Sequence, residues 1–561
     1  MKPILCILGI TFLLYAVSLP NAFVWDDEGQ IVDNQIIYDL RNVPEFFGSS
    51  TFYAGGAGLS GGFYRPLVSL SYSLNYQIWG LHAWGFRLVQ IGFHLLNTFL
   101  VFFLLFKLLS FTKVSWAKTA ALFASLLFAV HPANVEAVAY IASFGDVLYT
   151  SILLLALLVL PISLWGSIAL GFLGLFAKET AIVFFPLGFL LLIFLKASRK
   201  RLLLYVGGSA AAILSYFFIR LVLSGISFTQ QHIAPIAKAA LFERLLTIPH
   251  EIFTYLQLLV FPLYLSIYRH FVVASFLDIR FWGSLLFLLA LGVLSFLFLR
   301  PQKKEHQKLF LFSLAWFFFS IGPVLNIIPL DMTVSERWLY FPGIGGMLFL
   351  VLALMELAQK GLWQKRVAYG VLIFFAIFFS CRTLLRIQDW KDGFTLYGHD
   401  IQYAKGNANL ENNYGVELFR KGMIQEAGVH FQNSIAAEDQ WAISHNNLGA
   451  VLEQEGKLND AEQEYRRATQ ISDYYLAYEN LGSLLVRTEK FPEAKQFLES
   501  AIQKFPLNPK MNILLASLYF KEGDRDLSLE ALGRALMGNP SNPELRAFYE
   551  RMKRGEEVRF E

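Results

Sequence analysis

Directly after an apolar run from Ile4 to Pro20, the chain reads Phe23-Val24-Trp25-Asp26-Asp27-Glu28. The run is close to the length that crosses the hydrocarbon core of a bilayer, so the three acids are expected to emerge at the interface far from the N-terminus. Proximity of like charges and partial loss of water both raise a carboxyl pKa, which would let one acid accept a proton near neutral pH. The alternative interpretation is that Asp26 and Asp27 only mark the water boundary and cap a helix.

The composition is that of a polytopic membrane protein with a polar part attached. The chain has 561 residues, of which 55% are hydrophobic and 16% are charged, and its mean hydropathy is +0.48. These values place it outside the soluble class. The net charge of +4 is small, and Lys and Arg fall in separate loops, which argues against a nucleic-acid partner. Cys6 and Cys381 lie in apolar runs near opposite ends and predict no disulfide framework.

Apolar runs recur as far as Leu385 and predict eleven membrane spans. The predicted spans are 4–20, 86–109, 117–135, 147–161, 163–177, 180–196, 202–224, 277–299, 309–329, 340–358 and 367–385. A further apolar piece, 251–267, contains Pro262 and is not counted as a full crossing. The spans are expected to be embedded in membrane lipid.

Basic residues predict the orientation of these spans. They cluster in four loops, near Lys113, near Lys200, near Lys304 and near Lys365. If 251–267 does not cross, all four loops share the side of Met1, as the excess of positive charge in cytoplasmic loops requires. We therefore expect a cytoplasmic N-terminus, and the odd number of spans places everything after Leu385 on the periplasmic or extracytoplasmic side.

A period near 34 residues is visible from about Asn412 onward. Its marker pairs are Tyr414-Gly415, Leu448-Gly449, Leu481-Gly482 and Leu515-Ala516. Small residues recur one helix later, at Ala427, Ala461 and Ala494. Such offsets let two antiparallel helices pack closely, and this helix-turn-helix period resembles the tetratricopeptide repeat. The repeats predict a surface that binds or spaces other molecules.

The expected fold class is all-α. It comprises a membrane-embedded domain over 1–385 with an outer loop at 21–85, a connector over 386–411, and a repeat superhelix of about four repeats over 412–561.

Other charged groups fall on the same predicted side as Asp26 and Asp27. They are Arg65, His131, Glu136, Asp146, Lys178, Glu179, Glu336 and Arg337. Charges near a bilayer are costly unless they are paired or line a wet cavity, so their convergence predicts one shared polar cavity. Cations there suit a phosphate on a membrane-embedded carrier, and a carboxylate could deprotonate an incoming nucleophile. The alternative for Lys178-Glu179 and for Glu336-Arg337 is a structural ion pair at a span end.

Metal binding is not predicted by any helical pair of His and Glu at metalloenzyme spacing. His131 precedes Pro132 and is expected to be a helix-end group. A divalent cation would have to be bound by the carboxylates of Asp26 and Asp27.

Several motifs, in this order, resemble those of one family. They are Phe-Val-Trp-Asp-Asp with Asn34 downstream, His131-Pro132-Ala133-Asn134-Val135-Glu136-Ala137-Val138-Ala139 followed by Asp146, Lys178-Glu179-Thr180, and Glu336-Arg337-Trp338-Leu339-Tyr340 with Pro342. With the spans and repeats, they make nearly the whole chain similar to the transmembrane and tetratricopeptide repeat-containing O-mannosyltransferases. These are C-type glycosyltransferases, which use polyprenyl-phosphate sugars. The small number of repeats indicates a compact bacterial relative.

The resemblance implies inverting transfer of a sugar from a polyprenyl-phosphate donor to an acceptor at the outer face, in the simplest case a protein hydroxyl. Asp26 is the expected general base, and Asp27 positions the acceptor or shares that role. The expected phosphate-binding cations are Lys178, Arg337 and Arg65. His131, Glu136, Asp146, Glu179 and Glu336 are expected to support the site. The repeats are expected to hold an acceptor polypeptide or another protein.

Three alternative functions stay open. An oligosaccharide transferase or ligase with a lipid diphosphate donor would be expected to recruit more cations than these. A non-enzymatic, membrane-anchored repeat scaffold needs one span rather than eleven. A transporter would place its polar residues near mid-span, whereas these lie at span ends.

Overall fold

The computed structural model describes residues 2–51, 62–227, 234–300, 302–404, 406–540, 542–556 and 558. The chain divides into two compact units, Met1–Tyr403 and Ala404–Glu561. Helices make up the described residues apart from turns, loops and one isolated bridge between Arg269 and Val334. The all-α prediction is therefore confirmed. Residues 52–61 of the expected outer loop lie outside the described residues.

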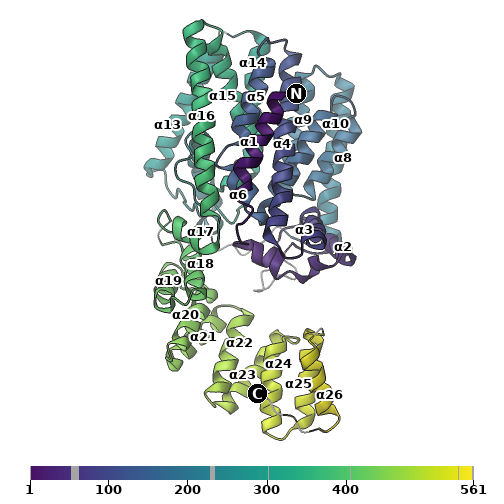
Figure 1. The fold of residues 1–561 in the computed structure, drawn as a ribbon, viewed down its shortest axis with the longest axis vertical. Coiled ribbons are helices and arrows are strands. Elements are labelled where there is room, and N and C mark those ends of the chain that lie inside the picture. The colour runs from purple at the N-terminus through teal and green to yellow at the C-terminus, as the bar shows by residue number, and fades with distance from the viewer. Residues whose placement is uncertain are drawn as a thin grey trace. The chain divides into compact units, whose positions relative to one another are not determined.

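The first unit is a bundle of apolar helices joined by short helical segments (Figure 1). Its longer helices are α1 (Lys2–Ala16), α3 (Pro66–Trp79), α4 (Ala83–Phe111), α5 (Ala117–Ala129), α7 (Phe144–Val159), α8 (Leu164–Leu175), α9 (Phe184–Phe194), α10 (Arg199–Phe218), α12 (Leu241–Val260), α13 (Ile279–Leu299), α14 (Lys304–Ile321), α15 (Pro342–Ala358) and α16 (Leu362–Asp389). The short helices that matter below are α6 (Asn134–Ala139) and α17 (Gly393–Asp400). Residues 386–403 pack in this unit.

Six helical stretches of the described chain are long and apolar enough to cross a membrane. They are Ala83–Phe111, Ile141–Val159, Arg199–Leu223, Ile279–Leu299, Lys304–Val324 and Leu362–Asp389. The other five predicted spans correspond to apolar helices of 10–17 residues: Lys2–Ala16, Ala117–Ala129, Leu164–Leu175, Glu179–Phe194 and Pro342–Ala358. The lengths and the apolar composition of these helices therefore support a multi-pass membrane protein.

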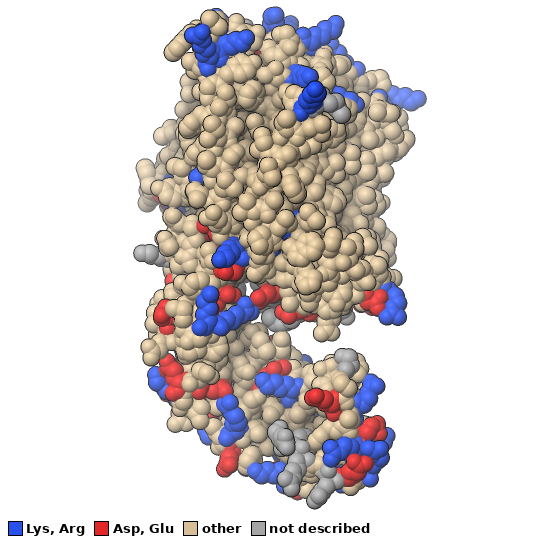
Figure 2. All heavy atoms as spheres, in the orientation of Figure 1, with Lys and Arg blue, Asp and Glu red and all other residues tan. Residues whose placement is uncertain are grey.

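The spans differ in where they lie within the bundle. The most apolar window of Ile141–Val159 is 83% buried, which makes it central, whereas that of Ile279–Leu299 is only 6% buried. Exposed leucines and phenylalanines along the second of these, such as Leu286 and Phe296, are what a lipid solvent allows. Figure 2 shows Lys and Arg gathered at the end of this unit where the N-terminus lies, and almost no charge over its middle.

The second unit consists of antiparallel helix pairs. They are α18 (Ala408–Arg420) with α19 (Ile424–Ala437), α20 (Ala442–Gln454) with α21 (Leu458–Ile471), α22 (Tyr475–Arg487) with α23 (Phe491–Lys504), and α24 (Pro509–Lys521) with α25 (Arg525–Gly538), followed by α26 (Pro543–Lys553).

Glycine permits the close contact inside these pairs. A Cβ atom at Gly449 would lie 2.6 Å from the ring of Tyr465, and Gly415 meets Phe431 in the same way. The turn between paired helices uses left-handed backbone at Gly422, with φ +77°. At the equivalent place in the third pair, Glu489 adopts φ +59° without a glycine.

Candidate functional site

A tight turn after α1 carries the acidic cluster. Trp25 has left-handed backbone, with φ +56°, which is rare for a bulky residue. The Val24 N–H donates to Asp27 Oδ2 at 3.0 Å, and the Asp27 N–H donates to the Val24 carbonyl at 3.1 Å. The Ala22 N–H donates to the Lys391 carbonyl at 2.9 Å. Hydrogen bonds within the turn and a hydrogen bond to the segment after α16 therefore both stabilise it.

Asp27 is the inner acid of the pair and has no exposed surface. Its Oδ1 accepts the Ala142 N–H at 2.7 Å. The buried guanidinium of Arg87 lies nearby and donates to the carbonyls of Ala139 and Asn21. Burial raises the pKa of Asp27 to about 7, although Arg87 and the backbone donors act in the opposite direction. These contacts fix Asp27 in place.

Asp26 is the outer acid and keeps part of its surface exposed. Its Oδ2 accepts the Tyr140 hydroxyl at 2.8 Å. The Tyr140 ring stacks on the rings of Trp25 and Trp390, with centroid distances of 5.2 and 5.1 Å. Burial raises the pKa of Asp26, while the Tyr140 hydrogen bond and Arg337 lower it. Asp26 therefore combines access with a raised proton affinity.

Arg337 links this turn to α6. Its Nη1 lies 2.5 Å from Glu136 Oε1, and its backbone N–H donates to the other carboxylate oxygen at 3.0 Å. The Ser335 hydroxyl also donates to Oε1 of the buried Glu136, at 2.9 Å. The Arg337 guanidinium also lies 5.6 Å from the ring centre of Trp25. This geometry places the Arg337 cation over the ring of Trp25, the residue that precedes Asp26.

The remaining predicted cations are paired close by. Lys178 Nζ donates to both oxygens of Asp146, at 2.6 and 2.7 Å, and both groups are buried. Arg65 donates to Glu179 at 3.3 Å. Arg65 acts electrostatically on both Asp26 and Lys178. Burial lowers the pKa of Lys178 to about 8 and the Arg65 charge acts in the same direction, so these groups share one neighbourhood.

Glu336 belongs to an adjoining network. It accepts the Ser266 N–H at 2.5 Å and pairs with Arg269 at 3.0 Å and with Arg386 at 3.3 Å. Arg386 also pairs with Asp400 of α17 at 3.3 Å. This network ties the segment after α12 to the end of α16.

His131 uses its ring nitrogens on the backbone. Nε2 lies 3.0 Å from the Leu259 carbonyl, and Nδ1 accepts the Ala133 N–H at 3.2 Å. Among the described residues, no group of three or more His, Cys, Asp or Glu side chains is arranged to hold a metal ion.

Four residues of this region were not predicted from the sequence: Arg87, Arg220, Tyr140 and Arg269. Arg87 and Arg220 each fall at or inside an apolar run. Because an arginine there is costly unless it is paired, their positions in the sequence could have predicted that both have buried partners. Arg220 donates to Glu179 at 3.1 Å. No sequence pattern distinguishes Tyr140 from other aromatic residues of the chain.

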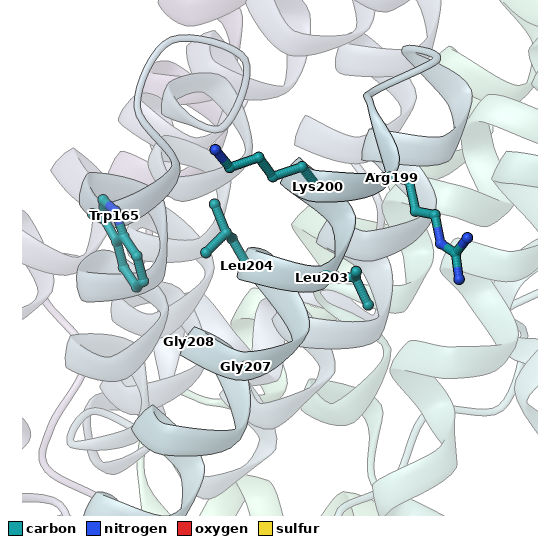
Figure 3. A pocket seen from close by; sticks show the side chains of 7 residues that line it. All are labelled: Trp165, Arg199, Lys200, Leu203, Leu204, Gly207 and Gly208. Carbon is teal, nitrogen blue, oxygen red and sulfur yellow. The ribbon is translucent and has the colours of Figure 1, made fainter.

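A separate cavity of about 500 Å³ lies between α8 and α10 (Figure 3). It is lined by Trp165, Arg199, Lys200, Leu203, Leu204, Gly207 and Gly208. None of the predicted site residues lines it. The convergence of charge around Asp26, rather than this cavity, therefore defines the candidate site.

These features are those of a polytopic helical membrane protein with buried, paired charges at the ends of its spans, followed by a helical repeat unit. Two tetratricopeptide repeat profiles match residues 442–474 and 485–552, which confirms the predicted repeats. A solved repeat protein, YrrB, described as a TPR protein with an unusual peptide-binding site, aligns with 27% of this chain and 77% of its own at 16% identity and a TM-score of 0.24.

The relatives of the whole chain are more specific. Human protein O-mannosyl-transferase TMTC3 is 25% identical across 97% of this chain and 65% of its own length. Human TMTC1 is 27% identical across 79% of this chain and 56% of its own length. Drosophila melanogaster Tmtc1 is 34% identical across 31% of this chain and 21% of its own length. The chain thus spans about 65% of human TMTC3. It is homologous to these protein O-mannosyl-transferases over most of its length, which confirms the resemblance seen in the sequence.

Proposed function

We propose that this protein is a membrane glycosyltransferase that moves a sugar from a polyprenyl-phosphate donor to a hydroxyl of an acceptor protein, with inversion. The names of the relatives favour mannose as the sugar. The acceptor oxygen forms a bond to the anomeric carbon while the bond from that carbon to the phosphate oxygen breaks. The acceptor proton passes to Asp26, and the polyprenyl phosphate leaves with the electron pair of the broken bond.

The observation that carries this proposal is the environment of Asp26. It is the acid that combines exposed surface with a raised pKa and a single side-chain hydrogen bond, from Tyr140. Asp27 is held by two backbone donors, and Glu136 is already paired with Arg337. A general base must be reachable by its substrate and must take up a proton readily, and Asp26 is suited to both because it is partly exposed and burial raises its pKa. Asp27 acts as its positioning residue.

The leaving phosphate is assigned to Arg65 and Arg337, with Lys178 in support. The side chains of Arg65 and Arg337 keep 18% and 12% of their surface exposed, and each guanidinium has more N–H groups than its carboxylate partner uses. Lys178 keeps 6% and is bound by both oxygens of Asp146. The two arginines can therefore accept an anion with less rearrangement.

We further propose that the N-terminus is cytoplasmic and that the chain beyond Leu385 is extracytoplasmic. Basic residues gathered at the N-terminal end of the first unit support this orientation (Figure 2). A reporter fused after Tyr403 should be active outside the cytoplasm; cytoplasmic activity would overturn the orientation.

The direct test is transfer from a labelled polyprenyl-phosphate sugar in membranes that contain the full chain. Asp26→Asn should lower the rate at least about 100-fold, because it removes the base. Glu45→Gln, an exposed acid of the same loop, is the matched control and should keep the rate. Unchanged transfer by a correctly inserted Asp26→Asn variant would remove the proposed mechanism. Activity only with a diphosphate donor would favour an oligosaccharide transferase.

A further inference from the structure

The cavity between α8 and α10 has a cationic end, and the rest of its lining is apolar (Figure 3). Arg199 and Lys200 begin α10 and line the cationic end, and both residues are exposed. In Figure 3, Lys200 extends toward the side of Trp165, whereas Arg199 extends the other way. No aspartate or glutamate is among the described residues that line the cavity. The cavity therefore combines positive charge with an apolar surface.

The positive charge at this end is not balanced by acids nearby in the chain. Residues 147–178 and 180–242 contain no aspartate or glutamate, so α8, α9 and α10 carry none. Within the described part of the chain, no ion pair joins Arg199 or Lys200 to a carboxylate. Arg201, by contrast, donates to two backbone carbonyls just before α8. Arg199 and Lys200 are therefore available to bind an anion.

The apolar part of the cavity lies on a face of α10 that is turned away from the bundle. The stretch Arg199–Leu223 is long and apolar enough to cross a membrane, and its most apolar window is only 17% buried. Positions 200, 204 and 208 are four apart and therefore follow one face, along about 12 Å of helix. Leu204 is 43% exposed, and Trp165 of α8 is 60% exposed. A ligand that contacts both the cations and this face must have an apolar part.

Two adjacent glycines shape the apolar part. A Cβ atom at Gly208 would lie 2.7 Å from Ile168 and 2.8 Å from the Trp165 ring, so glycine there lets α10 pack against α8. A Cβ atom at Gly207 would meet no heavy atom within 4 Å. Glycine destabilises a helix interior relative to alanine, and packing within the chain does not require it at Gly207. The open space beside Gly207 leaves room for a ligand to lie against the helix backbone.

We propose that this cavity binds one anionic phospholipid, with its phosphate at Arg199 and Lys200 and an acyl chain along Gly207. Charge complementarity selects the anion, because a guanidinium and an ammonium both donate charge-assisted hydrogen bonds to phosphate oxygens. The exposed apolar lining selects a lipid rather than a water-soluble phosphate. A tryptophan such as Trp165 suits the level of the headgroups, and basic pockets between spans are typical sites for anionic headgroups.

The lipid site is separate from the proposed transfer chemistry. On the proposed orientation, this end of the first unit faces the cytoplasm, so the phospholipid belongs to the cytoplasmic leaflet and Asp26 lies at the opposite face. Lipid binding goes beyond the proposed function and does not depend on it. Its role is to stabilise the contact between α8 and α10.

The test is native mass spectrometry of the purified full chain in dodecyl maltoside, titrated with dioleoyl phosphatidylglycerol or dioleoyl phosphatidylcholine. The first phosphatidylglycerol should bind about tenfold more tightly than the first phosphatidylcholine, because only the former has a net negative charge. The double variant Arg199→Gln, Lys200→Gln should lose this preference. The matched control Lys365→Gln, Arg366→Gln removes an exposed pair of cations at the start of α16 and should keep it.

A second variant tests the apolar part of the cavity. Gly207→Leu fills the open space without a clash and should weaken phosphatidylglycerol binding about tenfold, because the leucine takes the place of the acyl chain. Gly292→Leu in α13 is the matched control, since a Cβ atom there also meets nothing within 4 Å, and it should bind normally. Thermal unfolding without added lipid checks that the variants fold. If the double variant unfolds early, Gly207→Leu decides.

Several outcomes would overturn the proposal. They are equal binding of the two lipids by the unaltered protein, an unchanged preference in the double variant, and an equal loss in its control. Displacement of phosphatidylglycerol by glycerol 3-phosphate would assign the cavity to a water-soluble anion. Tighter binding of a polyprenyl phosphate than of phosphatidylglycerol would assign it to the sugar carrier. Asp26→Asn should bind phosphatidylglycerol normally, so loss of transfer and loss of lipid binding are distinguishable.

Discussion

The two units of this protein are held together by contacts of different range. In the first unit, the Arg337 N–H meets Glu136 across 201 positions and Asp27 meets Ala142 across 115. In the second, the bond between Asn480 and Asn446 spans 34 positions, the length of one repeat. Several buried charges of the first unit pair with partners far away in the sequence, whereas the buried core of the second unit packs between neighbouring helices. Loss of one partner should therefore cost the first unit more.

The largest effect is expected from breaking a buried ion pair of the first unit. Glu136→Gln leaves Arg337 without its carboxylate, in a place where water cannot fully replace it. We expect a loss of about 3–5 kcal/mol in the free energy of unfolding, together with loss of transfer activity. Thermal unfolding in detergent measures the first. Stability equal to that of the unaltered protein would mean that the Arg337–Glu136 pair is not essential to the bundle.

A smaller loss is expected from filling a close helix contact in the second unit. Gly449→Ala would place a methyl group 2.6 Å from the Tyr465 ring and should cost about 1–3 kcal/mol. Gly533→Ala is the matched control, because its nearest neighbour lies at 3.8 Å and alanine favours a helix. Its stability should stay equal or rise. Equal stability of both variants would contradict the role given to glycine in the repeat.

Tyr140→Phe should move the pH dependence of transfer without unfolding the site. The Tyr140 hydrogen bond stabilises the charged form of Asp26 and lowers its pKa, so its removal raises that pKa. A base works only when deprotonated, and the acidic limb of kcat/KM should therefore shift to higher pH. Tyr38→Phe, in the same loop, should leave the limb in place. A lower rate with an unshifted limb would assign Tyr140 a packing role alone.

The smallest effect is expected from an exposed ion pair of the repeats. Arg487 lies 2.5 Å from Glu453, and its side chain is 57% exposed. Arg487→Gln should change the free energy of unfolding by less than about 0.5 kcal/mol, and less still in high salt. Chemical unfolding at two salt concentrations checks this. A loss comparable to that of Glu136→Gln would erase the contrast between the units.

The same difference in range decides what the sequence could predict. Gly415, Gly449 and Ala461 predict the repeat because the residues they pack against lie within one period. The length of the apolar runs was enough to predict the spans. Charges at the ends of the predicted spans indicated that other charged side chains would lie on the same side as Asp26. The pairing itself could not be predicted, since nothing in the sequence near Arg337 indicates that Glu136, 201 positions away, binds it. Stacking of Trp25 on Tyr140 likewise depends on tertiary structure.

Rescue of Asp26→Ala by added formate would show whether Asp26 is the base, because a small carboxylate can replace a missing base where one is needed. Transfer should fall at least about 100-fold without formate and recover in part with it, whereas Asp27→Ala, which loses a positioning contact, should not recover. Transfer by Asp26→Ala at the unaltered rate without formate would mean that Asp26 is not the base.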